Sequence, residues 1–208
     1  FMQRRMDSAG TFPARIFHEE SAKIAERRKN RTPGSGVWSS LGPFLTPTTL
    51  QTGARGGSGR IDCLGFHPTN PSVVYVGTPT GGLWRTTDGG QSWTGLTDNL
   101  PTLGISAIAV HPQHPDTIFI ATGTRDIWWE TYSVGVMKST DGGMTWSETG
   151  LNFNLIENKS TTGLIINPAN PSMMLASTSA GLYRTLDGGE HWDLACTGNF
   201  KDIKSKPG

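Results

Sequence analysis

Short runs of apolar and β-branched residues alternate with segments rich in Gly, Pro, Asp and Thr along most of the chain after residue 58. Runs such as 73–76, 117–121 and 173–176 are too short for helices and are bounded by turn residues, so they predict β-strands. A Pro-x-x-Pro segment comes before each of these runs. Because proline cannot donate a hydrogen bond to a β-ladder, these segments predict loops at 68–71, 112–115 and 168–171.

The same order of elements occurs three times, and each copy ends in an Asp-Gly-Gly segment followed by a tryptophan. Asp88, Asp141 and Asp187 are 53 and 46 residues apart, which is close to the length of a four-stranded propeller blade, about 40–50 residues. The sequence therefore predicts an all-β fold, a partial β-propeller of four-stranded antiparallel blades. The predicted blades are 59–100, 101–152 and 160–198.

The Asp-Gly-Gly segments predict tight turns, because an Asp side chain can accept hydrogen bonds from the turn that follows it while glycines take positive φ. Each of the three tryptophans is expected to pack on a neighbouring sheet and to bury on the order of 200 Å². We assign these residues a structural role rather than a catalytic one. They are Asp88, Gly90, Trp93, Asp141, Gly143, Trp146, Asp187, Gly189 and Trp192.

The pattern Ser/Thr-x-Asp-x-Gly-x-Ser/Thr-Trp resembles the Asp-box (BNR repeat) of sialidases, sortilin-type receptors and xyloglucanase-like glycosidases, with His191 in place of the hydroxyl residue in the third copy. In sialidases these boxes lie away from the catalytic pocket, which agrees with a structural role. The wider layout, with Trp38-Ser39-Ser40-Leu41-Gly42-Pro43 and Thr122-Gly123-Thr124-Arg125-Asp126, resembles large surface or secreted proteins of Bacteroidetes. That resemblance implies an N-terminal propeller and a C-terminal type IX secretion sorting domain.

Three blades do not close a ring, since propellers use about 4–8 blades. The chain is thus expected to be the front portion of a longer protein whose remainder closes the propeller, or several chains complete one another. Residues 1–35 are expected to form a leader with a helix at 14–30, and residues 36–58 a latch strand with a Gly-rich linker. Residues 199–208 are expected to be a tail or a continuation.

Bulk composition excludes some partners. The net charge is +1 and only 17% of residues are charged, so neither nucleic acid nor an anionic membrane is an expected partner. No apolar run has membrane-spanning length. Cys63 and Cys196 lack the spacing of a metal site, and no metal or other cofactor is expected; the two cysteines pair once or not at all.

The second copy is longer than the others by about nine residues, inserted around 124–132. Insertions between blade strands become loops on one face, where ligands tend to bind. Aromatic rings there suit stacking on sugars, and polar side chains suit contacts with hydroxyls, so the predicted ligand site is Arg125, Asp126, Trp128, Trp129 and Tyr132. Asp126 and Glu130 are the weak candidates for a catalytic carboxylate pair. The alternative is that these aromatics cap a blade or pack on parts of the protein that follow this sequence.

Other positions read as structural. His67, His111 and Asn167 share one repeat position, which predicts a polar turn residue rather than a catalytic imidazole. Arg85, Lys138 and Arg184 share another, which predicts an exposed strand face. Ser8, in Asp7-Ser8-Ala9, matches the short O-glycosylation pattern of Bacteroidetes.

Three functions fit these features. The first is an exported, cell-surface or secreted binding or adhesion module, with carbohydrate or a surface protein as partner. The second is a glycoside hydrolase of the xyloglucanase-like class whose cleft is completed by further sequence. The third is a protein-interaction subunit of a surface assembly.

Overall fold

A computed structural model describes Lys23, Glu26 and residues 59–124 and 132–204 of the chain. The chain divides into two compact units, Phe1–Arg60 and Ile61–Gly208. In the first unit, Lys23 and Glu26 are helical. No helix in the described part of the chain is long and apolar enough to cross a membrane.

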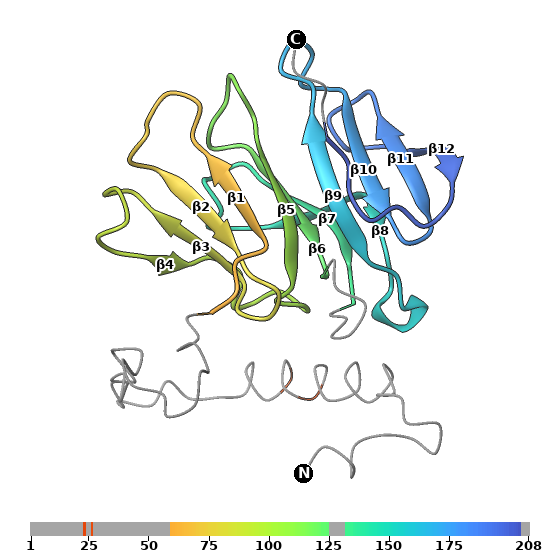
Figure 1. Cartoon of the computed structure of the whole chain (residues 1–208), viewed down its shortest axis with the longest axis horizontal. Coiled ribbons are helices and arrows are strands. Elements are labelled where there is room, and N and C mark those ends of the chain that lie inside the picture. The colour runs from red at the N-terminus through yellow and green to blue at the C-terminus, as the bar shows by residue number, and fades with distance from the viewer. Residues whose placement is uncertain (1–22, 24–25, 27–58, 125–131, 205–208) are drawn as a thin grey trace, which may run out of the picture. The chain divides into compact units, whose positions relative to one another are not determined.

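The second unit is built from three four-stranded antiparallel sheets, which follow one another in chain order (Figure 1). The first sheet contains β1 (Cys63–Phe66), β2 (Val74–Gly77), β3 (Leu83–Thr86) and β4 (Thr94–Gly95). The second contains β5 (Ile105–Val110), β6 (Ile118–Thr122), β7 (Gly135–Ser139) and β8 (Ser147–Asn152). The third contains β9 (Thr161–Ile166), β10 (Met174–Thr178), β11 (Gly181–Thr185) and β12 (Asp193–Thr197). A short 3-10 helix, η1 (Leu155–Glu157), lies between the second and third sheets in sequence.

The predicted fold class is confirmed: the protein is all-β, and its sheets are the blades of a partial β-propeller. Within each sheet the strands pair with their sequence neighbours, so each blade is a simple up-and-down meander. The last strand of each blade begins directly after the turn tryptophan. Strands β1, β5 and β9 lie against one another from blade to blade.

The middle sheet is covered on both faces, and its strands alternate between two cores. In β6, Ile118 and Ile120 belong to the core shared with the first sheet, whereas Phe119 and Ala121 belong to the core shared with the third. All five residues of β6 are buried. This explains why the run reads as continuously apolar rather than as alternating polar and apolar positions.

Glycines allow the sheets to approach closely. A Cβ on Gly77 would lie 2.8 Å from Ile105 Cγ2 of the second sheet. At the other junction, a Cβ on Gly150 would lie 2.2 Å from the carbonyl oxygen of Glu190. Both positions lie where one sheet rests on the next, and a larger residue would push the sheets apart.

The three turn tryptophans differ in their packing, which corrects one expectation. Trp146 is partly buried, and Trp192 packs against the core between the second and third sheets. Trp93 is 41% exposed, and its indole donates to Gly90 O of its own turn. The expectation of burial on a neighbouring sheet is wrong for Trp93, because no described sheet lies before the first one.

The basic residues of the third strands also differ from expectation. Arg85 is partly buried, and its Nη1 donates to Gly142 O in the turn of the next blade over 2.8 Å. Lys138 is partly buried as well and lies 3.6 Å from Glu190, again in the turn of the next blade. Arg184 alone of the three is exposed. The shared position is thus a contact toward the following blade, and it is an exposed strand face only where no described blade follows.

Candidate functional site

The insertion of the second blade is built onto a closed base that all three blades share. Thr122, the last residue of β6, donates its hydroxyl to Gly135 O at the start of β7 over 2.7 Å. Thr78 donates in the same way to Gly82 O over 3.0 Å, and Thr178 donates to Gly181 O over 2.8 Å. Each connection is therefore closed by the same threonine-to-glycine hydrogen bond, and the inserted residues extend the connection beyond this bond.

Further buried hydroxyls hold this base in place. Ser133 Oγ lies 3.0 Å from Thr122 Oγ1 and 2.9 Å from Thr161 Oγ1 of the third sheet. The amide of Val134 donates to Thr122 Oγ1 over 3.0 Å, and the amide of Gly135 donates to Ser133 Oγ over 2.8 Å. A buried network whose members are all satisfied is rigid. The two ends of the insertion are thus anchored to two sheets at once.

The connection between β8 and β9 contacts Ser133, the residue that follows the insertion. The amide of Ser133 donates to Lys159 O over 3.0 Å. The ammonium of Lys159 lies 4.9 Å from the ring centre of Phe153 and 2.6 Å from a carboxylate oxygen of Glu157. Hydrogen bonds from Lys159 and from the amide of Asn154 lower the pKa of Glu157. The surface next to the insertion is therefore polar and carries an ordered ion pair.

The predicted ligand residues divide at the border of the described segment. Arg125, Asp126, Trp128 and Trp129, together with the candidate acid Glu130, lie outside the described residues. Tyr132 is described and is partly buried next to Ser133. The structure thus shows the base of the predicted site and Tyr132. The geometry of an Asp126–Glu130 pair falls outside the described part.

The Asp-Gly-Gly turns lie at the ends of the strands opposite to the insertion, and the three turns share one hydrogen-bond pattern. In the second blade, Asp141 accepts from the hydroxyl of Ser139 over 2.8 Å, and from the amide and hydroxyl of Thr145 over 2.9 and 2.6 Å. These hydrogen bonds, those from Thr145 foremost, lower the pKa of Asp141 to about 2. Gly142 and Gly143 have φ of 71° and 92°, which suits glycine.

The other two carboxylates have the same surroundings. Ser92 and Thr86 lower the pKa of Asp88 by hydrogen bonding. Asp187 accepts from the amide of His191, and its second oxygen lies 2.7 Å from His191 Nδ1, which lowers the pKa of Asp187. Groups that accept so many turn hydrogen bonds and remain ionised are poor proton donors. The geometry supports a structural role for them.

Residues that sequence reasoning left open are placed as follows. Cys63 lies on β1 and Cys196 on β12, and no disulfide joins them. His67 and His111 each accept backbone amides through Nδ1, and Asn167 does so through Oδ1, as a polar turn residue should. The prediction for this repeat position is confirmed. Ser8 lies outside the described residues.

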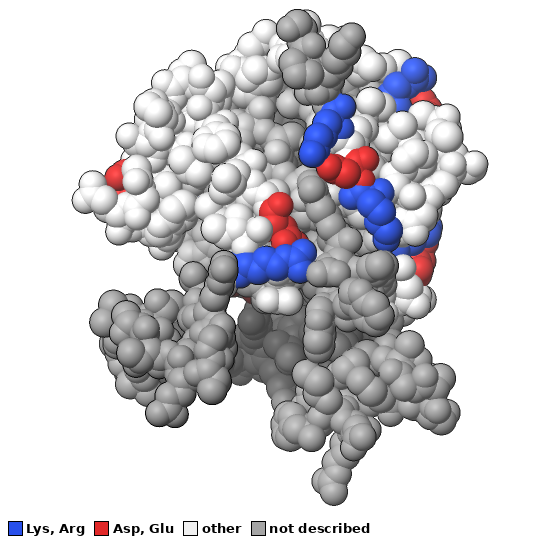
Figure 2. Space-filling model, viewed as in Figure 1, with Lys and Arg blue, Asp and Glu red and all other residues white. Residues whose placement is uncertain are grey.

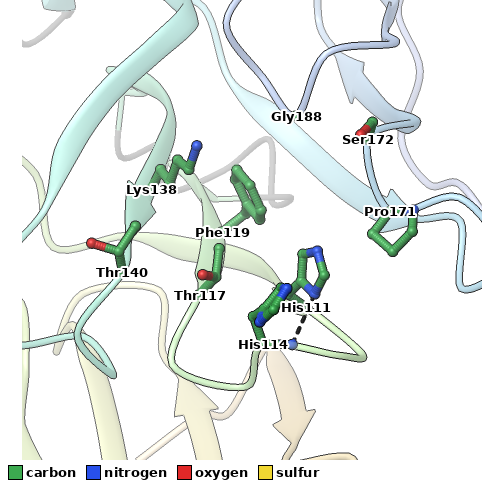
Figure 3. Close-up of a pocket in the computed structure, with 9 residues that line it drawn as sticks. All are labelled: His111, His114, Thr117, Phe119, Lys138, Thr140, Pro171, Ser172 and Gly188. Atoms are coloured by element: carbon green, nitrogen blue, oxygen red, sulfur yellow. Dashed lines mark hydrogen bonds between the residues drawn. The ribbon is translucent and has the colours of Figure 1, made fainter.

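Charge does not single out a site on the face shown in Figure 2. Blue and red residues lie beside one another there, with broad uncharged areas around them. A shallow cavity is present on the side of the molecule where the Asp-Gly-Gly turns lie, between the second and third sheets (Figure 3). It has a volume of about 250 Å³.

The threonines at the base of the insertion were not identified by sequence reasoning. Their signal was present, because Thr78, Thr122 and Thr178 occupy one position in all three copies. A threonine conserved within a repeat, just before a glycine-led strand, indicates a side chain that closes the connection.

The architecture and the anchored insertion define a partial propeller with one elaborated blade. No protein-family model matches the chain. It is 33% identical over 146 residues to a xyloglucanase of Hypocrea jecorina (strain QM6a), a match that covers 64% of this chain and 17% of the relative. It is 30% identical over 152 residues to a xyloglucanase of a Paenibacillus species, covering 68% of this chain and 15% of the relative.

Among solved structures, the chain is similar to an ancestral GH74 enzyme. The TM-score is 0.55 and the identity is 24%, over 64% of this chain and 18% of that one. This likeness concerns the fold. The chain spans less than a fifth of the length of the curated relatives that it matches.

Proposed function

We propose that this chain is part of an exported propeller protein that binds the polysaccharide xyloglucan, and that the insertion of the second blade contributes to the binding surface. The observation that carries the proposal is the identity of 33% over 146 residues to a protein named as a xyloglucanase. That stretch amounts to 64% of the chain, so most of the three blades takes part in the likeness.

The insertion is the part of the chain best suited to such a ligand. Its base is held by Thr122 and Ser133, which bond to each other and to two sheets. A rigid base favours binding, because less side-chain and loop entropy is lost when the ligand docks. Trp128 and Trp129 would stack on sugar rings, while Arg125 and Asp126 would contact hydroxyls.

Affinity electrophoresis of the 208-residue chain in gels with xyloglucan tests the proposal directly. We expect retardation by xyloglucan and a loss of at least about tenfold in affinity for the double variant Trp128→Ala, Trp129→Ala, since truncating an aromatic anchor at a binding surface often costs roughly 2 kcal/mol or more. Trp93→Ala is the matched control, because this indole is exposed at the opposite end of its blade. Equal retardation of the wild-type chain and the double variant would exclude the insertion as the binding surface.

Hydrolysis of xyloglucan by the complete protein is the second candidate function. It is favoured by the two curated relatives, both of which are named xyloglucanases. Glycoside hydrolysis needs two carboxyl groups about 5–9.5 Å apart, and the candidates of this chain are Asp126 and Glu130. We expect Asp126→Asn or Glu130→Gln to lower the release of reducing sugar by about 10²–10⁴-fold if that residue is the acid or base. If the complete protein binds xyloglucan but releases no reducing sugar from it, hydrolysis is excluded and the binding function stands.

Export to the cell surface or medium follows from the same proposal, because a plant polysaccharide is met outside the cell. A type IX sorting domain in the complete protein and a glycan on Ser8 are the finer parts of this idea. Cell fractionation with mass spectrometry of the mature protein tests all three points. A protein found only in the cytoplasmic fraction would contradict them.

A protein-interaction role in a surface assembly remains the third candidate and is tested by whether the exported protein co-purifies with a surface protein.

A further inference from the structure

The cavity between the second and third sheets has a mostly apolar lining with a few polar side chains, and none of its lining residues is acidic. Lys138 reaches it from β7, and His111 and His114 lie on the turn between β5 and β6. Pro171 and Ser172, from the turn between β9 and β10, lie across the cavity (Figure 3). The ammonium of Lys138 is 5.7 Å from the ring centre of Phe119, which forms part of the apolar floor.

The first junction, between the first and second sheets, shows which side chains fill the space that is a cavity at the second junction, between the second and third sheets. Arg85 Nη1 donates to Gly142 O over 2.8 Å, and Tyr75 lies close enough to Arg85 and Asp116 for both to influence its pKa, which burial raises. The carboxylate of Asp116 lies beside the same glycine, 3.6 Å from where a Gly142 Cβ would be. A phenol, a guanidinium and a carboxylate thus occupy the junction together, and Tyr75 is only 2% exposed.

The second junction has the same positions with smaller and less balanced side chains. Phe119 stands at the position of Tyr75, and Lys138 stands at that of Arg85. Ser172 replaces Asp116, and the equivalence is clear from the backbone: Gly188 N donates to Ser172 O as Gly142 N donates to Asp116 O, both over 2.9 Å. Relative to the first junction, the phenol hydroxyl of Tyr75, the bulk of the Arg85 guanidinium and the carboxylate of Asp116 are absent, and the cavity lies beside the residues that replace them.

The charge of Lys138 is only loosely compensated. Lys138 pairs with the carboxylate of Glu190 at 3.6 Å, and that side chain is 69% exposed. An ion pair so open to water contributes little. Lys138 is itself only 27% exposed, so a carboxylate placed in the cavity would meet a more favourable partner than Lys138 finds now.

The imidazole of His111 adds a hydrogen-bond donor to the cavity. His111 Nδ1 accepts from the amides of Gln113 and His114, over 3.2 and 3.0 Å. In the neutral ring the proton is therefore on Nε2, which can donate to a ligand. Burial, together with the nearby His114 and Lys138, lowers the pKa of His111, and the ring is thus a neutral donor at pH 7.

We propose that this cavity binds the carboxylate of a small ligand, which takes the place that the side chain of Asp116 holds at the first junction. Lys138 supplies the charge, His111 Nε2 and the Ser172 hydroxyl supply further donors, and Phe119 and Pro171 pack against the body of the ligand. A volume of about 250 Å³ lies below the range of about 300–1,000 Å³ typical of drug-sized ligands. The ligand is therefore of the size of a single sugar acid.

Titration of the 208-residue chain with sodium glucuronate, followed by NMR or calorimetry, tests the proposal. We expect saturable binding in the millimolar range, at least tenfold tighter than for glucose, the uncharged counterpart. Acetate and inorganic phosphate are the comparison probes. Acetate binding with the same dependence on Lys138 would show that the carboxylate alone is recognised, whereas phosphate binding tighter than both carboxylates would overturn the choice of ligand class.

Variants separate the cavity from general charge effects. Ser172→Asp recreates the arrangement of the first junction, so we expect at least a tenfold loss of glucuronate binding with no loss of thermal stability. Lys138→Met should lose binding to a similar extent. Arg184→Met is the matched control, since it removes a cation from the same repeat position at an exposed site, and it should bind like the wild type. Unchanged binding by Ser172→Asp, or an equal loss in Arg184→Met, contradicts the proposal.

This site is independent of the proposed xyloglucan surface. The insertion joins β6 to β7, whereas the cavity is formed by the turns at the other ends of these strands. The polysaccharide is uncharged, so Ser172→Asp should leave retardation by xyloglucan unchanged. Loss of one kind of binding in a variant therefore does not imply loss of the other.

Discussion

The indole Nε1 of Trp146 donates a hydrogen bond to the carbonyl oxygen of Leu96 over 3.0 Å, which ties the turn of the second blade to the end of the first. The neighbouring Gly143 is buried against the same residue, since a Cβ there would lie 2.7 Å from Leu96 Cδ1. In the first blade, Gly90 and Trp93 are exposed. The turn of a blade is therefore completed by the blade before it.

We expect Trp146→Phe to lower the free energy of unfolding by about 1 kcal/mol, because a net hydrogen bond is worth roughly that amount. Trp93→Phe is the matched control. Its indole bonds only to its own turn and is 41% exposed, so its loss should be smaller. Urea denaturation followed by circular dichroism measures both, and equal losses would show that the bond between blades adds nothing.

Gly150→Ala should separate the second and third sheets. The new Cβ would lie 2.2 Å from Glu190 O, and backbone cannot move aside as a flexible side chain can. Overpacking of this kind costs about 1–3 kcal/mol. Gly59→Ala, whose Cβ would meet nothing within 4 Å, should leave stability unchanged. Denaturant unfolding of the two variants is the measurement, and a neutral Gly150→Ala would mean that the junction is looser than described.

Asp141→Asn should lower the melting temperature by several degrees and flatten the acid limb of the stability curve. The folded pKa of Asp141 is lowered from 3.8 to about 2. Its stabilising effect is therefore present above about pH 4 and is lost as pH falls toward 2. Thermal scans between pH 2 and 6 check this, with the exposed Asp98→Asn as control. The same acid limb in wild type and Asp141→Asn would contradict the assignment.

His191 makes the stability of the third Asp-Gly-Gly turn sensitive to a rise in pH above about 6.5. The hydrogen bond to Asp187, and then its charge, raise the pKa of His191 above 6.5. The contribution of this pair is thus complete below about pH 6.5 and is lost as pH rises through the raised pKa. NMR titration of the imidazole should give a pKa above 6.5. His191→Thr, which copies Thr145 of the second blade, should remove the pH dependence above pH 6 while it keeps the hydrogen bond to Asp187.

Thr122→Val should loosen the base of the insertion. It leaves Gly135 O and the Val134 amide, both now bonded to Thr122 Oγ1, without this buried partner. Such a loss costs about 1–3 kcal/mol, and we expect weaker retardation by xyloglucan as well. Thr94→Val, at an exposed strand position, is the control in both assays. A stable variant with full xyloglucan affinity would mean that the hydroxyl network does not support the binding surface.

Local features were predictable from sequence because their hydrogen bonds join residues close along the chain. Asp88 bonds to Thr86 and Ser92, and His67 bonds to the amide of Asn70, within four positions in each case. Because the sequence contains three copies of the repeat, each of these local patterns can be recognised three times. Strand order followed too, since short connections force neighbouring strands to pair.

The junctions were not predictable in this way, and the candidate site only in part. The position of the insertion could be read from the spacing between Pro112 and Asp141, but the network of Thr122, Ser133 and Thr161 joins residues up to 39 positions apart. Arg85, Lys138 and Arg184 look alike in sequence, yet two of them reach the next blade and one is exposed.

The amino-acid sequence by itself determined the blade, because its turns, strands and Asp-Gly-Gly hydrogen bonds depend on residues near one another in the chain. Only the tertiary structure decided which faces are covered, how the base of the insertion is anchored, and that a cavity lies beside Lys138. The physical reason is that burial and charge compensation depend on what the adjacent sheet presents. Equivalent repeat positions therefore have different surroundings: Tyr75 lies near Asp116 at the first junction, whereas Phe119 and Ser172 line the cavity at the second.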